Sequence, residues 1–231
     1  MERRMKRKFH VRCEAGENLE ITSKSYLSLS DLADLGTVMG NVYHTKDDMI
    51  DCVNAFYEGM VTRSEEMKLH PNYRTGENYA YLGLSPQFLI FDEYVAFLEM
   101  LTTKESTALL SQLKKIVMLG RQAGYFLIVA CQRPDAKYFG DGIRDNFNFR
   151  VGLGRISELG YGMLFGSDVK KQFFQKRIKG RGYCDVGTSV ISEFYTPLVP
   201  KGHDFLQIIG SLAQARQDGT ATCEAKGDGT D

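Results

Sequence analysis

Two adjacent carboxylates follow an apolar run in the segment QFLIFDEY, residues 87–94. The apolar residues 88–91 run directly into Asp92 and Glu93. A short apolar run bounded by polar residues predicts a buried strand. Acids at its end have an ordinary interpretation, the start of a helix, where they favour the helix dipole and can accept from free N–H groups. They also have a chemical one, an Asp that holds a divalent cation beside a Glu that activates water.

A second apolar run, FLIVAC at residues 126–131, ends in Gln132 and Arg133, and Pro134 prevents the strand from continuing. The carboxyl ends of neighbouring parallel strands open onto one crevice, so Gln132 is expected near the acids of the first strand. A neutral amide can donate to a phosphate oxygen or to an attacking water without pairing with the acids. The alternative for Gln132 is a satisfied polar cap at a strand end.

The chemical interpretation corresponds to the Walker B motif of nucleoside triphosphatases. There the Asp helps to hold Mg²⁺, and the next Glu polarises the water that attacks the γ-phosphate. Four apolar residues followed by Asp-Glu are only moderately specific for this motif. The stretch alone leaves the helix-start and Walker B interpretations open.

The elements that must position these residues alternate between helices and strands. A helix is predicted from Lys46 to about Lys68, with Thr45 as its N-cap. A second helix is predicted to end near Gly120 or Gly124. A third strand is expected at about 149–153, and GRGYCDV and SVISEFY read as a closing hairpin around Gly187-Thr188. Apolar strands separated by helices indicate an α/β fold whose mainly parallel sheet is covered on both faces. The apolar positions that define the two helices are Met49, Val53, Phe56 and Met60 in the first, and Leu109, Leu113, Ile116 and Val117 in the second.

Composition excludes several classes of protein. The formal net charge is zero, so no overall field indicates a nucleic-acid partner. The five cysteines are scattered without a C-x-x-C pair, which argues against a disulfide framework and a zinc site and fits the reducing cytoplasm. The apolar runs are too short to span a bilayer, and the basic N-terminus has no apolar stretch behind it. A cytoplasmic location is therefore expected.

Motif order and spacing over residues 31 to about 195 resemble the motor domain of the FtsK/SpoIIIE family, within the HerA/FtsK group of DNA-pumping ATPases. The segments that carry the resemblance are, in order, FLIFDEYVAF, GRQAG, IVACQRP, FNFRVGLGRIS and GRGYCDVG. They look most like the versions encoded by conjugative elements of Gram-positive bacteria. The resemblance implies a RecA-like P-loop NTPase core in a hexameric ring that hydrolyses ATP with Mg²⁺ and drives double-stranded DNA through its centre.

The family's residue roles can be carried over where the motifs match. Asp92 resembles the magnesium-organising acid, Glu93 the catalytic base and Gln132 the sensor at the end of the next strand. Arg121, in GRQAG, lines up with the arginine finger that a subunit offers to its neighbour's ATP. Position alone favours a different role for Arg121, as a cation that complements the end of a helix. Arg150, like Arg155 after it, matches loosely as a phosphate or interface group.

One part of the family pattern has no counterpart. A P-loop ATPase needs G-x-x-x-x-G-K-[ST], whose amides wrap the phosphates, and this sequence contains no Gly-Lys dipeptide. The expected organisation is therefore an atypical leader (1–25), a partial FtsK-type ATPase domain (26–215) and a disordered polar tail (216–231). The simplest explanation is a truncated or disrupted reading frame in which the ATP-cradling half is missing. The N-terminal membrane segments that many family members carry are missing too.

Three functions follow as hypotheses. The first is part of an ATP-dependent double-stranded DNA translocase, in conjugative transfer or chromosome partition, whose binding of ATP by this chain alone is expected to be feeble. The second is a catalytically inactive module that binds DNA or joins rings of intact homologues. The third, a magnesium-dependent nuclease using Asp92 and Glu93, lacks the further acids of a two-metal site.

Contact with DNA has two candidate segments. Basic residues gather between Lys170 and Arg181, and others lie in the leader at residues 3–8. Such side chains would neutralise phosphates without reading sequence. A solvated helix face explains the first cluster equally well.

Overall fold

The computed structural model describes residues 42–139, 143–154, 156–166, 169, 180–188, 190–197 and 199–217. The chain divides into two compact units, and each is considered by itself. Residues 45–198 lie in the unit that carries Asp92, Glu93, Arg121, Gln132 and Arg150, and residues 42–44 and 199–217 lie in the other. The leader (1–25), the residues from 218 onward and the basic segment 170–179 fall outside the described residues.

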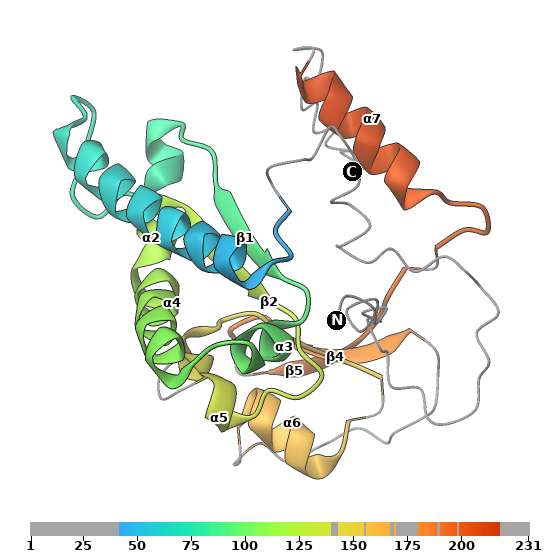
Figure 1. Cartoon of the computed structure of the whole chain (residues 1–231). Coiled ribbons are helices and arrows are strands. Elements are labelled where there is room, and N and C mark those ends of the chain that lie inside the picture. Colours follow the sequence, from blue (N-terminus) through green and yellow to red (C-terminus); the bar gives the residue numbers. More distant parts are fainter. Residues whose placement is uncertain are drawn as a thin grey trace. The chain divides into compact units, whose positions relative to one another are not determined.

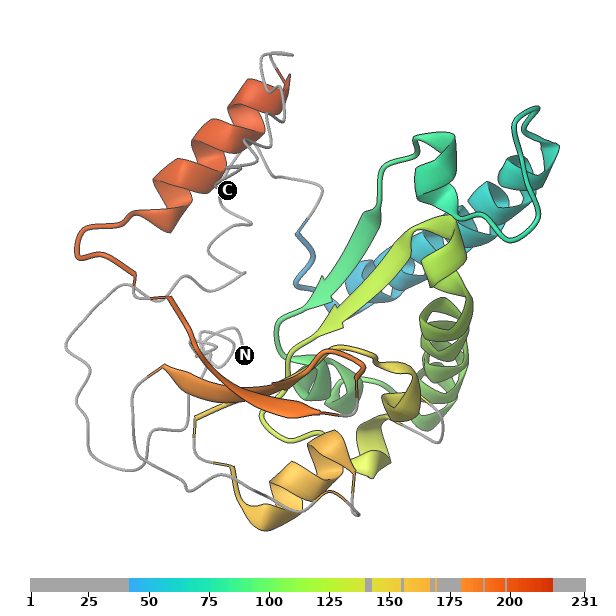
Figure 2. The same cartoon turned by 180° about the vertical axis from the view of Figure 1, so that it is seen from behind.

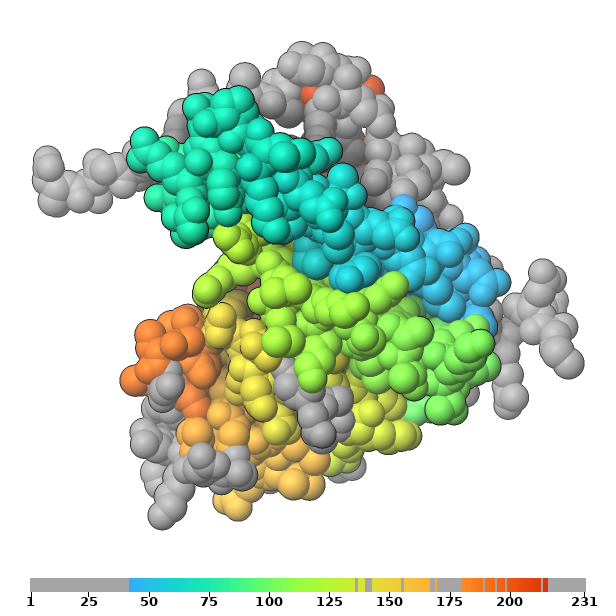
Figure 3. Space-filling view, turned by 90° about the vertical axis from the view of Figure 1, so that its left-hand side faces the viewer, coloured from blue at the N-terminus to red at the C-terminus, as the bar shows by residue number. Residues whose placement is uncertain are grey.

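Two long helices pack against each other on one side of the parallel strands. Helix α2 spans Lys46–Leu69, and helix α4 spans Thr103–Ala123. Figure 3 shows α2 (blue to cyan) lying across α4 (green). The side chain of Thr45 caps α2, as predicted, and Thr102 and Glu105 form a capping box at the start of α4.

An ion pair joins the N-terminal turns of the two helices. Lys46 Nζ donates to Glu105 Oε1 at 2.8 Å. This bond, followed by those from Thr102, lowers the pKa of Glu105 to about 2. The carboxylate therefore stays charged near neutral pH.

Two parallel strands carry the acids and the amide. Strand β1 spans Gln87–Phe91 and pairs with β2, Tyr125–Val129, in a register that sets Phe91 opposite Val129 (Figure 1). Helix α4 provides the crossover between them. Parallel pairing requires such a connection. Both strands were predicted, with ends that differ by one or two residues.

The two faces of β1 are covered unequally. Leu89 and Phe91 are buried in the same core as the inner faces of α2 and α4. Phe88 and Ile90, which point the other way, are each 55% exposed. Cover on both faces was expected, and among the described residues only one face has it.

Substitution of neighbouring residues in β1 should separate the two faces. Leu89→Ala is expected to lower the free energy of unfolding by about 2–4 kcal/mol, because it leaves a cavity in the core. Ile90→Ala should cost less than about 1 kcal/mol, because its side chain already meets solvent. Urea unfolding followed by circular dichroism measures both. Equal costs would show that the exposed face is covered.

A second sheet follows in the chain and is antiparallel. Strands β3 (Arg150–Leu153), β4 (Arg181–Asp185) and β5 (Ile191–Tyr195) pair in that order (Figure 2). The closing hairpin is confirmed. The expectation that residues 149–153 would extend the parallel sheet is wrong: β3 pairs antiparallel with β4. An apolar run indicates a strand but does not reveal its partner.

Helix α6, Glu158–Phe165, packs on this second sheet around a small core of Tyr161, Phe165 and Tyr183. The remaining elements are short, except for α7 in the other unit. They are the 3-10 turns η2 (Tyr79–Leu82) and η3 (Arg144–Asn146) and the helices α3 (Tyr94–Glu99), α5 (Ala136–Phe139) and α7 (Phe205–Gln217). No helix within the described part of the chain is long and apolar enough to cross a membrane.

Candidate functional site

The acids and the amide leave the parallel sheet together. Beyond the last paired residues, the main chains remain hydrogen-bonded: Ala130 N–H donates to the Phe91 carbonyl at 2.8 Å, and Tyr94 N–H donates to the Ala130 carbonyl at 3.0 Å. Asp92 and Glu93 thus emerge beside the segment that contains Gln132. The carboxyl ends of the two strands form one edge, as predicted.

Glu93 and Gln132 lie close together at this edge. The side-chain amide and the main-chain N–H of Gln132 act on the Glu93 carboxylate and favour its charged form. The predicted proximity of these residues is therefore confirmed. Glu93 is also the N-cap residue of α3, but its side chain makes no capping hydrogen bond. The helix-start interpretation thus loses its main contact at Glu93.

The environment of Glu93 favours its protonated form. Partial burial, followed by the charge of Asp92, raises the pKa of Glu93 above its ordinary value, although the N–H groups of Gln132 act in the opposite direction. Burial, followed by the charge of Glu93, raises the pKa of the neighbouring Cys131 thiol to about 11. A carboxyl group with a raised pKa is better suited to accept a proton from water near neutral pH.

Glu93→Gln is expected to stabilise the protein at neutral pH. A raised folded-state pKa gives stability that is present below the unfolded pKa and lost as pH rises through the folded value. Wild type should lose this contribution as the pH rises through the raised pKa of Glu93, and the variant should not. We expect a melting temperature about 1–3 °C higher in the variant at pH 8, with no difference near pH 3.5. Calorimetry across this pH range measures the difference in melting temperature. A variant less stable than wild type at pH 8 would contradict a raised pKa of Glu93.

Arg121 lies at the opposite end of the sheet. It is exposed in the last turn of α4, immediately before β2 begins, whereas the acids follow the strands' other ends. Five strand residues separate the two edges by about 16 Å. The structure therefore does not bring Arg121 to the acids of its own chain. This placement fits a residue that serves a neighbour, and that role stays a prediction.

Two glycines of GRQAG, Gly120 and Gly124, allow α4 to end and β2 to begin close beside it. A Cβ on Gly120 would meet the carbonyl oxygen of Tyr125 and lie 3.2 Å from its carbonyl carbon. Gly124 ends the helix in the left-handed conformation, with φ of 78°, which glycine adopts at little cost. The motif thus has a packing reason beside its resemblance.

Arg150 makes contacts of another kind. Its guanidinium donates to three main-chain carbonyls, those of Phe147 at 2.8 Å, Leu164 at 3.2 Å and Asp145 at 3.5 Å. These bonds tie the start of β3 to the end of α6 and to η3. They give Arg150 a structural role and lend no support to its expected role with phosphate. Arg155 lies outside the described residues.

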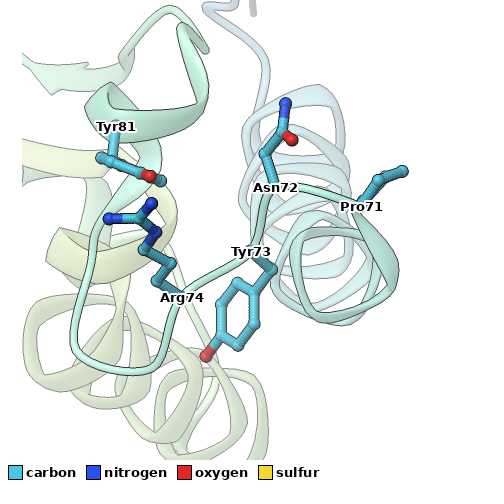
Figure 4. A pocket seen from close by; sticks show the side chains of 5 residues that line it. All are labelled: Pro71, Asn72, Tyr73, Arg74 and Tyr81. Carbon is cyan, nitrogen blue, oxygen red and sulfur yellow. The ribbon is translucent and has the colours of Figure 1, made fainter.

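A shallow hollow of about 380 Å³ lies in the loop between α2 and β1 and is lined by Pro71, Asn72, Tyr73, Arg74 and Tyr81. Figure 4 shows Arg74 reaching toward Tyr81, with its guanidinium carbon 5.5 Å from the ring centroid. This loop leads into the amino end of β1. The hollow is therefore remote from the acids.

The residues at this edge suit the Mg²⁺ of Mg²⁺-ATP, but the chain has no loop for the phosphates. Protein-bound Mg²⁺ takes one or two carboxylates, with waters and substrate phosphates as its other ligands, and Asp92 and Glu93 suit that chemistry. No group of three potential metal ligands occurs within the described ranges, so a metal held by protein alone has no support there. For the phosphates, the 231 residues contain no loop of the required sequence.

Sequence reasoning missed Tyr94, which follows Glu93 and is 1% exposed. An aromatic residue directly after the acids was the available signal. Its hydroxyl donates to the Tyr138 carbonyl at 3.1 Å, a partner 44 residues away that the sequence did not indicate.

Comparisons with known proteins give the family. No protein-family model matches the chain. The FtsK domain-containing protein YdcQ of Bacillus subtilis is 52% identical over 203 residues, which are 87% of this chain and 42% of that protein. The chain thus spans less than half the length of this relative.

Two solved structures share the fold at 17% identity. The pCW3 conjugation coupling protein TcpA, solved as a monomer form with ATPγS, has a TM-score of 0.51 over 65% of this chain and 44% of TcpA. The cytoplasmic domain of the type VII secretion ATPase EccC of Thermomonospora curvata has a TM-score of 0.50 over 75% of this chain and 22% of its own. The fold is accordingly that of an incomplete RecA-like core. On this fold and the identity to YdcQ, the chain belongs to the FtsK/SpoIIIE family.

Proposed function

We propose that this chain is the part of an ATP-dependent double-stranded DNA translocase that carries the metal-organising and water-activating residues. The observation that carries the proposal is that Asp92, Glu93 and Gln132 come together at the carboxyl ends of two neighbouring parallel strands. That is the edge at which α/β proteins bind ligands. TcpA, which shares the fold, was solved with ATPγS.

The three residues have separate roles in this proposal. Asp92 would help to hold Mg²⁺, which would supply positive charge to offset that of the phosphates. Glu93 accepts a proton from the attacking water, for which its raised pKa is suited. Gln132 orients that water or a phosphate oxygen through its amide and holds Glu93 in place.

The phosphate-binding loop has to come from outside these 231 residues. With Asp92 and Glu93 but no loop to cradle the phosphates, the chain alone should bind ATP weakly and hydrolyse it negligibly. DNA transfer in conjugation or chromosome partition, a hexameric ring and a cytoplasmic site of action belong to the same proposal. They are supported by membership of the family.

A second candidate is an inactive module that joins rings of intact relatives. The observation that favours it is the exposed Arg121, which is remote from its own acids and free of a structural hydrogen bond among the described contacts. In a mixed ring this residue would face a neighbour's ATP. The chain could then support or limit the activity of its neighbours.

One experiment tests both candidates. The steady-state ATPase rate of intact YdcQ, with Mg²⁺ and double-stranded DNA, is followed while this chain is added in increasing excess. We expect the rate per YdcQ subunit to change in a saturable manner. No change at any ratio would exclude the mixed ring, and turnover by this chain alone would exclude the inactive module.

A further inference from the structure

We propose that Tyr94 is a positioning residue that holds Gln132 against Glu93. The importance of that contact for hydrolysis rests on the proposed function. The contact itself involves no nucleotide, so it can be tested whether or not the chain takes part in ATP hydrolysis.

Tyr94 is bonded on both sides of the segment that contains Gln132. Its main-chain N–H donates to the Ala130 carbonyl at 3.0 Å, and its hydroxyl donates to the Tyr138 carbonyl at 3.1 Å. One residue, adjacent to Glu93, therefore closes a loop of nine residues at both ends. The loop's two ends are fixed relative to Glu93.

The ring of Tyr94 is fixed by packing. It meets Phe91 edge-on, with centroids 5.5 Å apart, and Phe139 at 5.1 Å. Burial, followed by the charge of Cys131, raises the pKa of the Tyr94 hydroxyl, so the group remains a hydrogen-bond donor throughout the neutral range. A buried donor and acceptor that satisfy each other are costly to separate.

A second set of contacts holds the same loop at the surface. The Tyr138 hydroxyl donates to Glu99 at the end of α3, and Lys137 lies 3.5 Å from the same carboxylate. These groups are exposed, so their interactions should contribute little to the stability of the loop. They nevertheless show that both ends of α3 contact residues 137–138, while Tyr94 reaches the loop from within the core.

Tyr94→Phe removes the hydroxyl and keeps the ring. The readout is the ¹H–¹⁵N signals of Gln132, its main-chain N–H and side-chain amide, followed from pH 3.5 to 8.5. In wild type these signals should shift as Glu93 titrates. Asp92 and Cys131 are the other titratable neighbours of Glu93. If the shift comes from Glu93, the Glu93→Gln variant should abolish it.

In Tyr94→Phe we expect the pH-dependent shift of Gln132 to shrink at least about threefold, because the loop end near Tyr138 is released. Tyr73→Phe is the matched control: Tyr73 is half-buried against the same core, its hydroxyl makes no hydrogen bond among the described residues, and its removal should leave the Gln132 shift intact. An unchanged shift in Tyr94→Phe overturns the proposal.

A donor placed back at this position gives the complementary test. Incorporation of 4-aminophenylalanine at residue 94 restores an N–H near the site of the hydroxyl and should restore the Gln132 shift. This variant also tests the proposal if Tyr94→Phe fails to fold. If the 4-aminophenylalanine protein folds but lacks the Gln132 shift, the proposal is contradicted. If the wild-type shift is present but no ATP hydrolysis is found in any mixture, the positioning stands and the proposed function fails.

Discussion

Arg121→Ala in this chain is expected to lower ATP hydrolysis by a neighbouring intact subunit about 10³-fold. At a saturating excess of this chain, each YdcQ subunit in a mixed ring would be flanked by it, and Arg121 would be the arginine offered to the YdcQ-bound ATP. An arginine finger stabilises charge that develops on the transferred phosphoryl group, which accounts for an effect of that size. The measurement is the steady-state rate per YdcQ subunit with wild-type or variant chain.

The position of Arg121 gives this expectation its physical basis. The residue is exposed at the end of α4, at the edge of the sheet away from Asp92 and Glu93. It is remote from the acids of its own chain, as a role toward a neighbouring subunit requires. If Arg121 instead only complements the helix dipole, its loss should cost less than about 1 kcal/mol of stability and leave the neighbour's rate unchanged.

Two controls make the result specific. Gln122→Ala alters the next exposed residue of the same turn and should leave the rate as in wild type. Arg121→Lys keeps the charge but loses the planar fork of donors, so most of the fall in rate seen with Arg121→Ala should also occur with lysine. A wild-type rate with Arg121→Ala would exclude the finger role.

Gly120→Ala is expected to destabilise the domain by at least about 2 kcal/mol, although alanine is the better helix former. The added methyl group would collide with the main chain of Tyr125, at the point where β2 begins. A main-chain oxygen cannot move aside as a side chain can. The relief of this collision must shift α4 against β2, and with it the position of Arg121.

A second helical glycine provides the control. Gly210, in α7, has no atom within 4 Å of the place its Cβ would take. Gly210→Ala should therefore be neutral or stabilise its helix by up to about 1 kcal/mol. Urea unfolding should therefore show a loss of stability in Gly120→Ala and no loss in Gly210→Ala. A neutral Gly120→Ala would show that α4 and β2 do not approach as closely as described.

Local signals in the sequence were sufficient for the elements that carry the acids. The cap at Thr45 and the apolar repeat predicted α2 to within one residue of its end at Leu69. Two apolar runs with a helical segment between them predicted the parallel pair, and a parallel pair places strand ends together. The contact of Gln132 with Glu93 followed from that geometry.

Contacts between distant segments could not be predicted in this way. The Tyr94 hydroxyl and the Arg150 guanidinium bind main-chain carbonyls, which every residue possesses, so no side-chain pattern marks the acceptor. Strand β3 is an apolar run like β1, and only its pairing with β4 reveals a separate antiparallel sheet. Where the acceptor is a main-chain carbonyl, the sequence can indicate the donor side chain but not the residue that accepts its hydrogen bond.

The most direct test of the central claim is ATP turnover by the purified 231-residue chain with Mg²⁺ and double-stranded DNA, beside the Glu93→Gln variant. The acids are present and the phosphate-binding loop is not in this sequence, so neither protein should exceed the background rate. Turnover by the wild-type chain that Glu93→Gln abolishes would contradict the claim, because it would show a complete catalytic site within these residues.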